Sequence, residues 1–121
     1  MSFDQVLQTI VDQGNGVLGA VLMGGDGIAI AQAKPRAAGG NADISAAGVE
    51  FERILAEVAK ASDAIGGGPV SELVVSLARL TLIFSVVEDE VMIVVALATD
   101  GNLGKARYLI RRNLVTIRQQ L

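Results

Sequence analysis

Two short segments of this 121-residue chain have residue types and spacing that could do chemistry. Gly24-Gly25-Asp26-Gly27 resembles a phosphate-binding loop, and Glu88-Asp89-Glu90 offers the oxygen ligands that divalent cations prefer. A phosphate loop, however, leads into a helix and ends in Lys followed by Ser or Thr, whereas the glycine segment lies between two apolar runs. Three consecutive acids at a hairpin tip diverge. We therefore interpret both segments as turns between strands.

The composition narrows the possible chemistry further. The chain has no His and no Cys, which removes the commonest general base near neutral pH, thiol nucleophiles, disulfides and zinc–cysteine sites. No Ser has a visible base partner, and no pair of carboxylates is arranged for acid–base work. The sequence therefore predicts a non-enzymatic protein without a catalytic residue, a cofactor or a metal site, and a binding module is the interpretation that remains.

The hydrophobic periodicity divides the chain into eight elements. A first helix begins at a capping box of Ser2 and Gln5 and ends at Gly14-Asn15-Gly16. The other expected elements are strands at 17–23 and 28–33, a loop at 34–41, a helix at about 43–65 stopped by glycines 66–68 and Pro69, strands at 72–78, 80–87 and 91–98, and a helix from about 103 to the end. The close spacing of the last three strands indicates an antiparallel meander.

The resulting order α-β-β-α-β-β-β-α predicts a single domain over residues 1–121 of the mixed α/β (α+β) class. The strands are apolar on both faces, so the sheet must be covered on both sides. No apolar run reaches the length of a membrane span, and the N-terminal segment lacks the features of a signal peptide. We therefore expect a cytoplasmic protein without membrane insertion.

The charge is distributed unevenly along the chain. The net charge is −3, yet the last 21 residues carry five cations and no acid, namely Lys105, Arg107, Arg111, Arg112 and Arg118. One interpretation is a basic binding face. The other is a solvated helix face whose cations complement the helix dipole. Nucleic acid is not an expected partner, because five cations without aromatic neighbours are a weak footprint.

The long helix presents more apolar surface than one sheet requires. Its wide apolar stripe comprises Ile44, Ala47, Phe51, Ile54, Leu55, Val58, Ala61 and Ile65. The opposite stripe comprises Glu50, Arg53, Glu57 and Lys60, with charges of both signs three and four residues apart. The apolar stripe either lies wholly on the chain's own sheet or also meets a second copy, for which Ala46, Ala47 and Gly48 are small enough.

The strand at 72–78 gives a second indication of self-association. It is long and apolar, and Glu72 and Arg79 are its only flanking charges. Natural edge strands are usually protected by charge, proline or a bulge. If this strand lies at the edge of the sheet, we expect it to be covered or paired with another chain.

The chain resembles the Roadblock (dynein light chain) family, in particular its bacterial MglB-like branch. The resemblance extends over nearly the whole chain, and two segments carry most of it. Residues 17–28, VLGAVLMGGDGI, are similar to the family's strand, tight Asp-Gly turn and second strand. Residues 100–107, DGNLGKAR, are similar to the family's Asn-Leu-Gly opening of the last helix.

The resemblance implies a profilin-like fold, with a five-stranded antiparallel sheet that has the long helix on one face and the terminal helices on the other. It also implies a homodimer, or a heterodimer with a paralogue, formed by pairing the long helices and the third strands. The partner would be a small Ras-like GTPase. The expected function is therefore a dimeric, non-enzymatic GTPase regulator in bacterial polarity, motility or signalling; the alternatives are a scaffold without effect on turnover and a small-ligand sensor.

These expectations select two sets of residues. The expected dimer interface comprises Ala47, Gly48, Phe51, Leu55, Val74 and Val75. The expected GTPase contact comprises the charged stripe of Glu50, Arg53, Glu57 and Lys60.

Overall fold

The computed structural model describes residues 2–35 and 44–121, and its elements follow the predicted order. The elements are α1 (Phe3–Gln13), β1 (Val17–Gly24), β2 (Ala29–Ala33), α2 (Ile44–Ile65), β3 (Glu72–Ser76), β4 (Thr81–Glu88), β5 (Val91–Leu97) and α3 (Leu103–Gln119). The expected start of the long helix at Asp43 and most of the expected loop at 34–41 lie outside the described residues.

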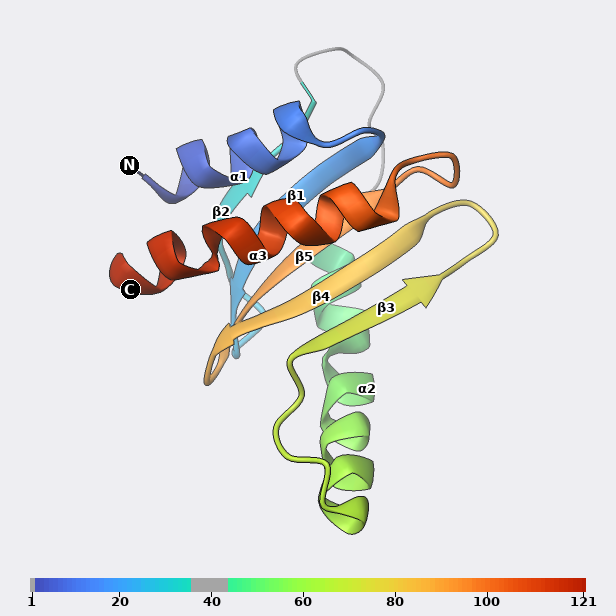
Figure 1. The fold of residues 1–121 in the computed structure, drawn as a ribbon. Coiled ribbons are helices and arrows are strands. Elements are labelled where there is room, and N and C mark those ends of the chain that lie inside the picture. The colour runs from blue at the N-terminus through green and yellow to red at the C-terminus, as the bar shows by residue number, and fades with distance from the viewer. Residues whose placement is uncertain (1, 36–43) are drawn as a thin grey trace.

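The five strands form one antiparallel sheet in the order β2-β1-β5-β4-β3 (Figure 1). The last strand of the chain therefore lies at the centre of the sheet, where Val94 pairs with both Val21 and Phe84. The antiparallel meander of β3, β4 and β5 is confirmed, and β3 lies at an edge, the position that the sequence left open.

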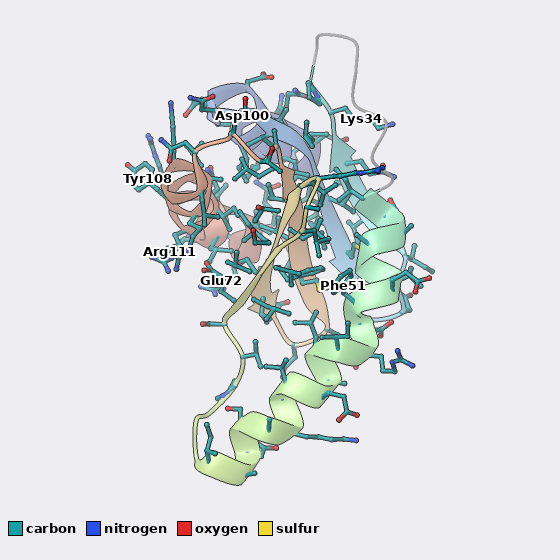
Figure 2. The ribbon with its side chains drawn as sticks, turned by 90° about the vertical axis from the view of Figure 1, so that its right-hand side faces the viewer. Lys34, Phe51, Glu72, Asp100, Tyr108 and Arg111 are labelled. Carbon is teal, nitrogen blue, oxygen red and sulfur yellow. The ribbon has the colours of Figure 1, made fainter. Side chains whose placement is uncertain are left out.

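Helices cover both faces of the sheet, as the continuous apolar strands require. Figure 2 shows the sheet between α3 and α2. The core under α1 and α3 contains Leu7, Ile10 and Ile110 packed with Ile83 and Ile93. A second core lies under α2. There the rings of Phe51 and Phe84 have centroids 5.2 Å apart, next to Met23 and Val94. The α+β architecture expected from the resemblance is thus confirmed.

Each strand differs from its predicted range by one or two residues at one end or both, and at two of these ends a turn takes up the terminal residues. β2 begins at Ala29, since Ile28 belongs to the turn: its N–H donates to Asp26 Oδ1 (3.1 Å) and its carbonyl accepts from Gly24 N–H (3.0 Å). β3 ends at Ser76, because Leu77 N–H donates to the Leu80 carbonyl (2.9 Å) and closes the hairpin. Apolar character alone does not locate such closing bonds.

Local capping bonds hold the terminal helices in position. The capping box of Ser2 and Gln5 is present at the start of α1. At the start of α3, the Asn102 side chain accepts from Lys105 N–H (3.0 Å), and Asn102 N–H donates to the Asn15 carbonyl (2.9 Å). The second family-like segment therefore joins α3 to the end of α1, and its role is structural.

Candidate interaction surfaces

The glycine segment forms a hairpin turn, which confirms the sequence interpretation. Gly27 N–H donates to the Gly24 carbonyl (3.1 Å), and Gly27 has a φ of 80°, a left-handed conformation that glycine adopts without strain. The turn leads from β1 directly into β2, whereas a phosphate loop leads into a helix. Backbone conformation accounts for the glycine at position 27.

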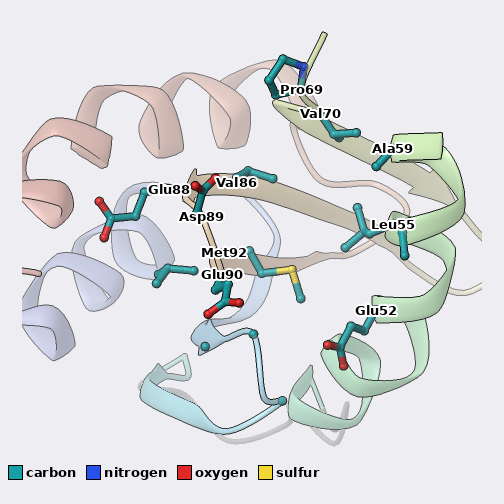
Figure 3. Close-up of a pocket in the computed structure, with 16 residues that line it drawn as sticks. Glu52, Leu55, Ala59, Pro69, Val70, Val86, Glu88, Asp89, Glu90 and Met92 are labelled. Carbon is teal, nitrogen blue, oxygen red and sulfur yellow. The ribbon is translucent and has the colours of Figure 1, made fainter. Parts of the chain in front are cut away.

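The three acids between β4 and β5 also form a turn. Glu88 ends β4, and Glu90 has a φ of 66° in the tight connection to β5. Figure 3 shows the Glu88 side chain pointing away from that of Glu90. Within residues 2–35 and 44–121, no group of three or more acids is arranged to hold a metal ion.

Three of the five cations in the last 21 residues contact residues of the sheet. Arg107 Nε lies 2.6 Å from the Glu72 carboxylate, and the Arg111 guanidinium lies 3.9 Å from the same carboxylate (Figure 2). Arg118 Nε donates to the Val87 carbonyl (2.6 Å). These contacts favour the structural interpretation for three of the cations, whereas Lys105 and Arg112 are exposed on the outer side of α3.

The long helix α2 extends beyond the sheet that it covers. Its buried residues, Ile44 and Gly48, lie in its first half, and its second half passes the edge formed by β3 (Figure 1). Ile54 is 40% exposed and Ile65 is 83% exposed, although both belong to the apolar stripe. The chain's own sheet therefore covers only part of this stripe, and an apolar flank remains beside the open edge.

Residues of α2 fall on three sides of the helix. Phe51 and Leu55 face the sheet. The apolar flank, defined here as Ala47, Ile54, Val58, Ala61 and Ile65, lies on one side at spacings of three, four and seven residues. The charged stripe points outward: Glu50, Arg53, Glu57 and Lys60 are exposed, and Glu57 and Lys60 form a surface ion pair at 3.5 Å. The apolar flank and the charged stripe are thus two different sides of the same helix.

Comparison with solved structures relates the whole chain to known proteins. The chain is 31% identical to MglC from Myxococcus xanthus, with 100% of both chains covered and a TM-score of 0.71. The chain belongs to the Roadblock/LC7 family. A Roadblock/LC7 domain from Streptomyces avermitilis is 17% identical, with 99% of this chain and 98% of that chain covered and a TM-score of 0.82. The gliding protein MglB from Thermus thermophilus is also 17% identical, with coverages of 91% and 81% and a TM-score of 0.81. No family sequence model and no curated protein sequence matches the chain.

In the single chain, several residues of the expected dimer interface contact the chain's own sheet. A Cβ atom at Gly48 would overlap Met23 Sδ, so this glycine allows α2 to approach the chain's own β1. Phe51 and Leu55 likewise pack against the sheet core. The expected close approach of two helices at Gly48 is therefore replaced by a helix–sheet contact.

The two expected interface residues on β3 lie on opposite faces of the sheet. Val75 packs toward α2 together with Leu73, whereas Val74 alternates with them and is 36% exposed. Glu72, on the same face as Val74, binds Arg107 of α3. On its outer side β3 has no neighbour among the described strands, so its backbone groups are available there.

The Roadblock domain also has a groove that the sequence analysis missed. The groove has a volume of about 580 Å³ and lies between α2 and the tips of the β1–β2 and β4–β5 hairpins (Figure 3). Its apolar lining includes Leu55, Ala56, Ala59, Val70, Val86 and Met92, and its acids are Glu52, Glu88, Asp89 and Glu90. Glu52 is far from the other three acids in the chain, and no local pattern in the sequence marks it as their neighbour.

Proposed function

We propose that this Roadblock protein is a dimeric regulator or scaffold of a small Ras-like GTPase in a bacterial motility, polarity or signalling system. The observation that carries this proposal is the full-length similarity to MglC, together with the fold that the chain shares with an MglB described as a gliding protein. The protein would act by binding and would supply no catalytic side chain of its own. The cytoplasm, where such GTPases work, is the proposed location. In residues 2–35 and 44–121, no helix is long and apolar enough to cross a membrane.

The proposed dimer joins the β3 edges and the apolar flanks of two α2 helices. The second half of α2 extends past the β3 edge, which is the side where a paired copy would place its own sheet (Figure 1). Ile54, Val58 and Ile65 would then lose water-accessible apolar surface, which is favourable. The partner chain is either an identical copy or a paralogue with the same edge. Within the first set of expected residues, the proposed contacts are Val74, which is 36% exposed, and Ala47 and Val75, which are half-buried and also pack against the core under α2.

The proposed GTPase contact is the charged stripe of Glu50, Arg53, Glu57 and Lys60. In the proposed dimer the two stripes would lie on the outer surface of adjacent helices and form one continuous face. A protein can bias a GTPase switch only by binding its two nucleotide states with different affinity. We therefore expect the stripe to contact a surface that changes between the GDP and GTP forms.

Titration with a small Ras-like GTPase from the same organism tests the proposal. We expect at least about a tenfold difference in affinity between the GDP-loaded and GTP-analogue-loaded forms, which corresponds to about 1.4 kcal/mol of coupling. The fourfold reversal E50K/R53E/E57K/K60E leaves the net charge unchanged and should weaken binding without dissociating the dimer. The variant K105E/R112E on α3 is the control and should bind normally.

Three results would contradict parts of this proposal. Equal affinity for both nucleotide states, with unchanged GTP turnover, would reduce the protein to a scaffold. A larger loss of binding from the α3 control than from the α2 variant would mean that the contact lies on the opposite face. No binding to the GTPase in either nucleotide state would reject the proposed partner.

A further inference from the structure

The acids of the groove beside α2 are not neutralised by any residue that the structure describes. Glu52 comes from α2, and Glu88, Asp89 and Glu90 come from the β4–β5 turn; all four are exposed. Figure 3 shows Glu52 and Glu90 on opposite sides of the groove. None of them forms an ion pair with a described residue. The groove therefore combines an apolar floor with acids at its rim, where the side chain of Glu88 points away from that of Glu90 (Figure 3).

The outer side of α3 has the complementary chemistry. Lys105, Tyr108, Arg112 and Val115 are spaced three, four and three residues apart, so they lie on one line of the helix. We call this line the α3 stripe. Tyr108 is 59% exposed and Val115 is 58% exposed, and Figure 2 shows Tyr108 pointing away from the sheet. The stripe therefore alternates cations with apolar side chains.

We propose that the α3 stripe of a second copy docks into the acid-rimmed groove. The Tyr108 ring and Val115 would cover the apolar floor, and Lys105 and Arg112 would face the carboxylates of the rim. A tyrosine gains from such a site because its ring buries a large apolar area while its hydroxyl stays at the wet rim. The opposite charges select this orientation and speed the encounter of the two copies.

This contact joins two different surfaces of the chain. The groove belongs to the α2 side of the sheet, whereas the stripe lies on α3, which covers the other side (Figure 2). Copies joined through unlike surfaces form a ring where the rotation between neighbours closes, and an open chain where it does not. The proposed form is the open head-to-tail chain, which leaves a groove and a stripe free at its ends. The contact uses neither the apolar flank of α2 nor the β3 edge, so it goes beyond the proposed dimer and does not depend on it.

Sedimentation velocity of the full chain tests the proposal. At low salt, the weight-average mass should rise continuously between about 10 and about 500 µM protein. It should fall back toward that of the basic unit at about 0.5 M salt, where charges are screened beyond a few ångströms. The monomeric or dimeric nature of that basic unit does not affect the test.

Two charge-reversed variants identify the surfaces. The weight-average mass of the groove variant E52K/E90K and of the stripe variant K105E/R112E should not depend on concentration. In each variant the groove and the stripe carry charges of the same sign and repel each other. An equimolar mixture should recover the concentration dependence, since the reversed groove of one variant attracts the reversed stripe of the other. The variant D4K/D12K changes the net charge of the chain as much as the groove variant does, but on α1, and should associate like the wild type.

Several results would overturn the proposal. The first is a wild-type mass that stays constant over the whole concentration range. The second is a loss of association in D4K/D12K, and the third is an equimolar mixture of the groove and stripe variants that does not associate. A loss in the groove variant alone, with normal association of the stripe variant, would also overturn it, since another segment or a small ligand would then be the occupant.

Discussion

At the scale of single residues, Gly27 is the position where backbone conformation matters most for the first hairpin. Its φ of 80° is unfavourable for residues with a Cβ atom, and most unfavourable for β-branched ones. A Cβ atom at this position would have Val49 Cγ2 as its nearest neighbour at 3.4 Å, an ordinary contact, so conformational strain and not lack of space opposes substitution.

We therefore predict that Gly27→Val lowers the free energy of unfolding by about 1 to 3 kcal/mol. Gly27→Asn should cost less, because asparagine tolerates the left-handed region. Gly104→Ala is the matched control. It lies in the first turn of α3, where a Cβ meets only Asn102 Oδ1 at 3.7 Å, so it should be neutral or slightly stabilising. Urea denaturation measures all three, and equal losses for Gly27→Val and Gly27→Asn would contradict the strain argument.

A second consequence of this turn concerns nucleotides. Because the glycines form a hairpin turn, magnesium with ATP or GTP should leave the melting temperature of the isolated protein unchanged. An increase in melting temperature with either nucleotide would indicate binding to the protein itself and would restore the phosphate-loop interpretation.

At the scale of elements, α2 has to contact its own sheet and, in the proposed dimer, a second α2. Gly48→Glu is a poor test of dimerisation, because the side chain would collide with Met23 in the core of the monomer. Ile54 is the better position, since it is 40% exposed in the single chain and lies on the apolar flank.

We predict that Ile54→Glu dissociates the dimer while the monomer stays folded. An unpaired charge buried in the interface costs several kcal/mol, on the order of 3 to 5. Val49→Glu is the control, since Val49 is 52% exposed on the same helix and positions five residues apart differ by about 140° around the axis. Light scattering with circular dichroism distinguishes the variants. A wild-type monomer at about 50 µM would reject the dimer, whose dissociation constant we place well below that concentration.

At the scale of the whole molecule, dimerisation should contribute to thermal stability. A partner that binds only the folded state stabilises it by mass action. The melting temperature of the wild type should therefore increase with protein concentration, measured by calorimetry over about a hundredfold range. Ile54→Glu should melt at a lower temperature that does not depend on concentration. A wild-type melting temperature that is independent of concentration would mean that no second copy covers the β3 edge and the apolar flank of α2 in solution.

The sequence by itself determined the order of the elements, the turns and caps, and the need for cover on both faces of the sheet. These features follow from signals between residues close in the chain, such as the capping box at Ser2 and the glycine at position 27. The resemblance in residues 17–28 and 100–107 added the arrangement of the helices around the sheet.

Only the tertiary structure decided which side chains meet. The pairing of Glu72 with Arg107, the close approach of Gly48 to Met23 and the groove between α2 and the hairpin tips all join residues far apart in the chain. Their positions depend on strand register and on where α2 crosses the sheet. A shift of one residue in register would turn Glu72 to the other face, away from α3. Composition and periodicity do not contain that information, because they define the faces of each element but not the distances between elements.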